Sequence, residues 1–188
     1  MPSVRLRHSI SLIVALGSTA CSDRVVPAAE VELRPAEGRF FWRGEPFTGK
    51  ARSTYANGER SELASFVDGI REGERRKWFD DGTLAYSATY RRGKLHGTAT
   101  SWWRSGQKRS ESRYRMGTSH GTQRRWYASG ALFKELRLVE GREEGLQRAW
   151  RENGKLFANY EAKDGRTFGL KRAGLCFGLE DEVVQLAQ

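Results

Sequence analysis

Residues 97–120 read GTATSWWRSGQKRSESRYRMGTSH, and residues 121–144 read GTQRRWYASGALFKELRLVEGREE. The two stretches share a glycine at the first place, a tryptophan five places later, and glycines nine and twenty places later. The same frame fits the sequence before and after them, so a 24-residue repeat organises most of this 188-residue chain.

Three series of glycines keep the 24-residue spacing. The series are Gly49, Gly73, Gly97, Gly121, Gly145 and Gly169; Gly58, Gly82, Gly106, Gly130 and Gly154; and Gly69, Gly93, Gly117, Gly141 and Gly165. In the second series, the dipeptides Asn57-Gly58, Asp81-Gly82 and Asn153-Gly154 predict two-residue hairpin turns with positive φ at both positions. The third series predicts a second turn in each repeat.

The residues between the turns alternate with the period of a β-strand. In the second repeat, Leu84, Tyr86, Ala88 and Tyr90 fall on one face of residues 83–90, and no stretch of the array has a convincing helical period. We therefore predict an all-β fold, an elongated single-layer meander or open β-solenoid of tandem 24-residue β-hairpins. Five repeats over residues 47–168 give about ten strands, and equivalent positions of neighbouring repeats lie about 10 Å apart.

Two side-chain series recur once per repeat. Trp78, Trp102, Trp126 and Trp150 are expected to pack on one another as the structural core of the array. Arg52, Arg76, Arg124 and Arg148 occupy another repeat position, where Thr100 interrupts the series. Strand alternation places these arginines on the face of the tryptophans. They are therefore either partners that stack on the indole rings or a candidate binding row for an anionic ligand.

The sequence lacks the patterns of a catalytic or metal site. No GxSxG or HExxH motif is present, and no Cys or His spacing suits zinc. His96 and His120 are one repeat apart, about 10 Å, which is too far to share a metal ion. We expect no enzymatic activity, no metal and no cofactor.

The chain carries a net charge of +10. Basic and acidic residues are mixed through every repeat, which is typical of a solvated face, although the excess also suits an anionic lipid, lipopolysaccharide or acidic protein partner.

The first 20 residues have the order of a secretory signal. Arg5 and Arg7 precede the apolar run ISLIVAL at residues 10–16, and small residues follow at 17–20. The run is too short to span a bilayer. Residues 21–46 are interpreted as an anchor, a tether and a leading segment, and residues 169–188 as a C-terminal segment that caps the last sheet edge.

Residues 17–21, GSTAC, resemble the lipobox of bacterial lipoproteins, although Ser18 stands where Leu is usual. The resemblance implies that Cys21 is lipidated. Because Ser22 is not Asp, it also implies an outer-membrane lipoprotein of the cell envelope. The alternative is ordinary signal cleavage, which gives a soluble periplasmic or secreted protein whose Cys21 is free to pair with Cys176. Nucleic acid is not an expected partner of an exported protein.

The glycine series, the W-x-x-x-G frame of Trp78 to Gly82 and of Trp126 to Gly130, and the stretch GEPFTG at residues 44–49 together resemble the MORN repeat family. They are most similar to bacterial MORN-variant arrays, often labelled YwqK-like antitoxins. The resemblance implies a non-enzymatic scaffold or protein-binding module, with an antitoxin or immunity protein that neutralises a specific toxin as the alternative. It identifies no particular partner.

Overall fold

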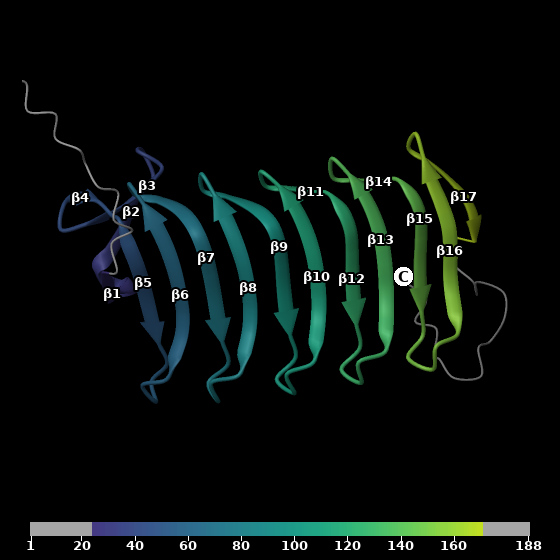
Figure 1. The fold of residues 1–188 in the computed structure, drawn as a ribbon, viewed down its shortest axis with the longest axis horizontal. Coiled ribbons are helices and arrows are strands. Elements are labelled where there is room, and N and C mark those ends of the chain that lie inside the picture. The colour runs from purple at the N-terminus through teal and green to yellow at the C-terminus, as the bar shows by residue number, and fades with distance from the viewer. Residues whose placement is uncertain (1–23, 171–188) are drawn as a thin grey trace, which may run out of the picture.

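The computed structural model describes residues 24–170, and its elements are β-strands apart from one short 3-10 helix, η1 (Ala28–Glu30) (Figure 1). A 14-stranded sheet forms the body of the molecule. Its ten principal strands are β5 (Gly49–Thr54), β6 (Arg60–Val67), β7 (Ile70–Trp78), β8 (Leu84–Arg91), β9 (Lys94–Trp102), β10 (Lys108–Arg115), β12 (Gly121–Trp126), β13 (Leu132–Val139), β15 (Gly145–Trp150) and β16 (Leu156–Lys163).

These ten strands pair in chain order as consecutive antiparallel hairpins, which confirms the predicted all-β meander of hairpin repeats. The shorter strands complete the sheet: β1 (Val25–Pro27), β11 (Thr118–Ser119), β14 (Arg142–Glu143) and β17 (Arg166–Leu170). Because β1 pairs with β5 in parallel, the sheet is mixed. The sheet is elongated, and β1 and β17 lie at its opposite ends (Figure 1).

The turn at Asn57-Gly58 has a different geometry from the predicted two-residue turn. The amide of Gly58 donates to the carbonyl of Tyr55, and the amide of Tyr55 donates to the carbonyl of Glu59. Gly58 has a φ of 85°, whereas Asn57 does not adopt positive φ. The loop is therefore a three-residue turn with a glycine bulge. The prediction was wrong because the Asn57 side chain caps the turn, accepting a 3.0 Å bond from the Glu59 amide.

The second turn of each repeat is the one that uses two residues with positive φ. Asp68 and Gly69 have φ values of 49° and 72°, and Val67 pairs directly with Ile70 around them. Arg92, Met116, Glu140 and Asp164 have the same conformation, each before a glycine of the third series. These are type I′ turns, which match the right-handed twist of the strands.

The first glycine series marks a bulge that bends every second long strand. In the β6–β7 pair, Phe66 lies opposite Arg71 and Ala64 lies opposite Arg75, so three residues of β7 face Ser65 alone. Gly73 lies in this bulge with a φ of 87°. The β8–β9 pair has the same irregularity around Gly97. Bulges of this kind increase local bending and twist, which explains the glycine at the start of each repeat.

Strand register divides the sheet into two faces. The face that we call the alanine face carries Ala51, Ala64, Ala88, Ala99, Ala149 and Ala158 in directly paired positions, and all six are buried. The opposite face, which we call the arginine face, carries Arg52, Arg76, Arg124 and Arg148. Trp78, Trp102, Trp126 and Trp150 are half-buried, so the buried positions in the middle of the sheet belong to alanine rather than to tryptophan.

A small cap covers the N-terminal end of the alanine face. Strands β2 (Val31–Arg34), β3 (Arg39–Trp42) and β4 (Glu45–Pro46) form a separate three-stranded sheet. Phe47 is 1% exposed, and its ring centroid lies 5.6 Å from that of Phe66. Residues 21–46 are expected from the sequence to include a tether, but from residue 25 onward they form strand β1 of the long sheet, η1 and the three-stranded cap.

Several sequence predictions fall outside the described residues. These are the signal at residues 1–20, the lipid site Cys21, Cys176, and the C-terminal segment beyond residue 170. Within residues 24–170, no helix is long and apolar enough to cross a membrane.

Candidate functional site

The four arginines predicted as a binding row lie on one register line of the arginine face. From β5 to β16 the line reads Arg52, Leu63, Arg76, Ser87, Thr100, Glu111, Arg124, Glu135, Arg148 and Asn159. Each strand contributes one residue, so a different side chain separates each arginine from the next. Two of the intervening residues, Glu111 and Glu135, are acidic and lower the positive charge of the row.

Acidic residues neutralise most of the arginine row. Arg124 Nε lies 2.8 Å from Glu135 Oε2, and Arg148 lies 2.7 Å from the other oxygen of the same carboxylate. The hydrogen bond from Arg124 is the main reason that the pKa of Glu135 is lowered, and the bond from Arg148 adds to it while burial opposes it. Arg76 pairs with Glu74 at 2.8 Å. Arg52 has no ion pair with a described residue.

Stacking of the row on the tryptophans occurs at one position. Arg148 lies 5.3 Å from the centroid of the Trp150 ring. Other cations contact the rings of two further tryptophans: Arg60 lies 4.2 Å from Trp78, and Lys108 lies 5.9 Å from Trp126. The tryptophans are therefore partly covered by cationic side chains as well as by the sheet.

The aromatic residue that ends the short strand-length run of a repeat, at positions 55, 103 and 127, connects that repeat to the next. Tyr55 donates a 2.7 Å bond to the carbonyl of Trp78, and Tyr127 donates a 3.0 Å bond to the carbonyl of Trp150. Trp103 makes the same link through its indole N–H. The sequence prediction missed this role. Its visible signal was an aromatic residue every 24 positions, at Tyr55, Phe79, Trp103 and Tyr127, of which all but Phe79 carry a ring donor.

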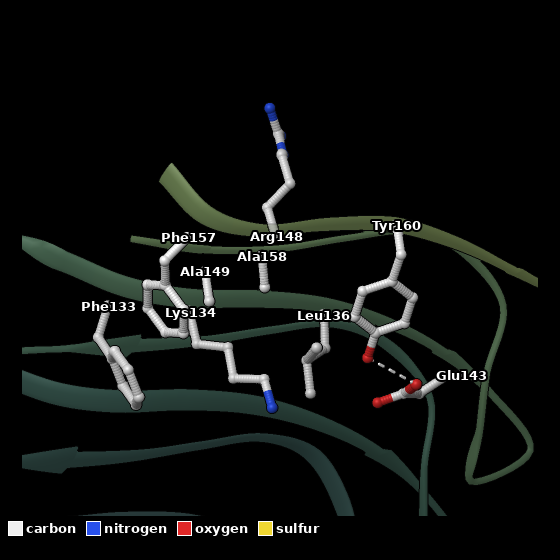
Figure 2. A pocket seen from close by; sticks show the side chains of 9 residues that line it. All are labelled: Phe133, Lys134, Leu136, Glu143, Arg148, Ala149, Phe157, Ala158 and Tyr160. Atoms are coloured by element: carbon white, nitrogen blue, oxygen red, sulfur yellow. Dashed lines mark hydrogen bonds between the residues drawn. The ribbon is translucent and has the colours of Figure 1, made fainter. Parts of the chain in front are cut away.

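The alanine face is hollowed at three places, with volumes of about 340, 150 and 110 Å³. The largest of these three hollows lies over β13, β15 and β16, where Figure 2 shows Arg148 pointing away from the other lining side chains. The Phe133 and Phe157 rings stack with centroids 6.4 Å apart and form its apolar part.

Tyr160 forms the polar part of the same hollow. Its hydroxyl donates a 2.9 Å bond to Glu143, drawn as a dashed line in Figure 2. Burial, followed by the Glu143 carboxylate, raises the pKa of Tyr160 to about 12. The phenol therefore stays protonated at neutral pH and remains a hydrogen-bond donor.

The cations of the alanine face differ in their partners. Arg75 and Lys77 share Glu62, at 2.8 and 3.5 Å. Burial opposes ionisation of Glu62, but its bonds to Arg75 and Lys77 hold its pKa below the ordinary value. Arg125 and Lys134 lie directly opposite each other across β12 and β13. Neither has an acidic partner among residues 24–170.

The two histidines of the array differ, because His96 accepts a hydrogen bond and His120 Nδ1 is buried without one from the described residues. His96 Nδ1 accepts a 3.4 Å bond from the Met116 amide, and His120 Nδ1 lies 3.5 Å from Glu140. In the described part of the chain, no three His, Cys, Asp or Glu side chains gather as a metal site would require.

A comparison with protein families matches the MORN repeat variant to residues 71–92 and 95–116. These residues include nearly all of the β7–β8 and β9–β10 hairpins, which are central units of the array. No enzyme family matches the chain. A comparison with curated proteins found no match.

Proposed function

We propose that this MORN repeat protein is a non-enzymatic module that binds a protein partner on the alanine face of its sheet. The observation that carries the proposal is the contrast between the two faces. The arginine row is largely neutralised by glutamates. The alanine face combines three hollows with aromatic side chains and with two cations that have no acidic partner in the part of the chain that the structure describes.

The architecture supports binding over an extended surface. Repeats that contact only their neighbours build long faces, and such faces commonly serve as contact surfaces for other macromolecules. The buried alanines leave room above the middle of the sheet, where Tyr86, Tyr90 and Tyr114 are half-buried instead of fully covered. A partner would add contacts to side chains that the fold already holds in place, which lowers the entropic cost of association.

Site-specific photo-crosslinking from both faces tests this proposal. A crosslinking residue at Tyr86 or Tyr114 projects from the alanine face, and the same residue at Ser87 or Arg113 projects from the arginine face as the matched control. We expect the alanine-face variants to capture one defined protein in the producing cell, and the controls to capture none. Capture with equal yield from both faces would refute the assignment of the binding surface.

We further propose that a lipid on Cys21 holds the array at the outer membrane. The order of residues 1–21 supports this, and replacing Cys21 by Ser should release the protein into the soluble fraction without changing its fold. Retention of the variant in membranes would contradict the anchor. A crosslinked partner that is toxic when expressed alone would identify the module as an immunity protein, whereas a structural envelope protein would identify a scaffold.

A further inference from the structure

We propose that Arg125 and Lys134 form a binding site for an acidic side chain of the protein partner, a step that rests on the function proposed above. The two residues are directly paired across β12 and β13. Like charges in this position destabilise a sheet, because the cations face each other at close range. The isolated fold gains nothing from this pair, whereas a bound carboxylate would neutralise it.

Among residues 24–170, no carboxylate acts as a counter-ion to this pair. Along the register line, Ser110 lies next to Arg125, and Ala149 lies next to Lys134. The carboxylates on this face are already engaged, since Glu62 pairs with Arg75 and Glu143 accepts from Tyr160. The described residues thus supply an acid to the cations of the β6–β7 pair and leave the β12–β13 pair unmatched.

Two adjoining hollows define what the site would hold. Arg125 and Lys134 both line the hollow of about 150 Å³, together with Ser112 and Gln123, whose polar groups suit a carboxylate. Lys134 also lines the 340 Å³ hollow that contains Phe133 and Phe157. The geometry therefore fits a segment in which an acidic residue is followed or preceded by an apolar one. Charge complementarity with two cations selects an acidic peptide as the occupant.

Binding of a defined peptide tests the site. The probe is a short fluorescein-labelled peptide of Glu and Phe residues, compared with a peptide in which Gln replaces every Glu. We expect the full chain to bind the acidic peptide, and R125Q/K134Q to lower the affinity by about tenfold, since hydrogen bonds to charged groups are the strong ones. The Gln peptide should bind the two proteins equally weakly.

The chain offers a matched control for the double variant. Arg91 and Lys94 are also cations paired directly across two strands, but they flank the turn of the β8–β9 hairpin and line none of the three hollows. R91Q/K94Q therefore makes the same change in net charge outside the hollows. We expect it to retain the affinity of the unaltered protein for the acidic peptide. An equal loss of affinity in both variants would mean that net charge alone is responsible, and it would overturn the proposed site.

Stability gives a second readout. If the pair serves a ligand, R125Q/K134Q should unfold at the same or a higher urea concentration than the unaltered protein, because a repulsion is removed. A lower midpoint would assign the pair a structural role and overturn the inference. Failure of the unaltered chain to bind the acidic peptide would also overturn the inference. The same holds if the pair binds vesicles of phosphatidylcholine and phosphatidylglycerol but not the peptide. In each case, crosslinking confined to the alanine face would leave the proposed function standing.

Discussion

Arg92, Met116 and Glu140 occupy positions of positive φ in type I′ turns, where asparagine, aspartate and glycine are favoured. In this conformation the Cβ of any L-residue crowds the following carbonyl, and Arg, Met and Glu lack the local hydrogen bond by which a short polar side chain offsets that cost. The array therefore stores strain at three of its turns. Asp68 and Asp164, at equivalent positions, carry a better-suited residue.

Replacing Arg92 by Asn should stabilise the protein by about 0.5–1 kcal/mol, since the turn would gain a residue suited to its backbone. Arg92 is exposed, so little packing is lost. Urea denaturation measures the change, and Arg91→Asn, in the neighbouring strand position, is the control that should be neutral or destabilising. A midpoint at or below that of the unaltered protein would contradict the strain at Arg92.

Glu135 makes stability depend on pH. Its pKa is lowered in the folded state, so the stability that it contributes is present above the ordinary value of 4.5 and is lost as pH falls through the folded-state pKa. Glu135→Gln should cost about 0.5–1 kcal/mol at pH 7, and this difference from the unaltered protein should shrink below about pH 4.5. The free energies of unfolding at pH 7 and at a pH below about 4.5 measure this difference, and substitution of the exposed Glu161 by Gln is the control. A difference independent of pH would show that packing is responsible.

At the scale of the element, the turn that the sequence predicts for the hairpin differs in type from the turn in the structure. The Asn57-Gly58 dipeptide carries the usual signal of a two-residue turn, but Asn57 uses its side chain to accept the Glu59 amide. The φ angle of Asn57 depends on whether the chain forms a two-residue turn or a three-residue turn capped by the asparagine side chain. The Asn-Gly dipeptide alone is compatible with both turns. The repeat period and strand positions did not depend on this choice, so they were predictable.

The loss of the Asn57 cap should therefore be measurable. Asn57→Ala removes both the bond to Glu59 and a 3.0 Å bond to the carbonyl of Asp80 in the next repeat. We expect a loss of about 1–2 kcal/mol, by the usual net value of a hydrogen bond. Ser129→Ala, at the same place in another repeat, should change stability by less than about 0.5 kcal/mol. Equal effects at the two positions would argue against capping.

The candidate site was less predictable than the strands, for a physical reason. Strand alternation alone places Arg125 and Lys77 on the face opposite the arginine row, but the residues that lie across from each depend on strand register. Register here includes a bulge in every repeat, and the number of extra residues in a bulge has no marker beyond the glycine. The pairing of Lys77 with Glu62, and of Arg125 with Lys134, therefore became visible only in the structure.

At the scale of the whole molecule, burial is uneven along the array. The aromatic cluster around Phe47, Phe40 and Phe66 lies at the N-terminal end, whereas the central units bury mainly alanine. Because each repeat contacts only its neighbours, the stability of one end is weakly coupled to that of the other. The N-terminal cap should thus protect β5 and β6 most strongly.

Phe47→Ala should destabilise the N-terminal end by about 3–5 kcal/mol, the usual cost of removing a buried aromatic ring. Hydrogen exchange should show loss of amide protection in β5 and β6, with little change in β15 and β16. Phe168→Ala, which removes a 55% exposed ring at the other end, is the control and should leave β5 and β6 unaffected. A uniform loss of protection along the sheet would mean that the array unfolds as a single cooperative unit.

The bond from Tyr55 to Trp78, repeated from Tyr127 to Trp150, sets a rule for how this chain can change length. The donor in one unit and the acceptor in the next are 23 residues apart. An insertion shorter than a complete repeat would therefore separate them and displace the turns from their register. A whole unit restores every link and extends the sheet by about 10 Å. Duplication of complete units would thus let the same design reach across gaps of different width, in steps of one hairpin.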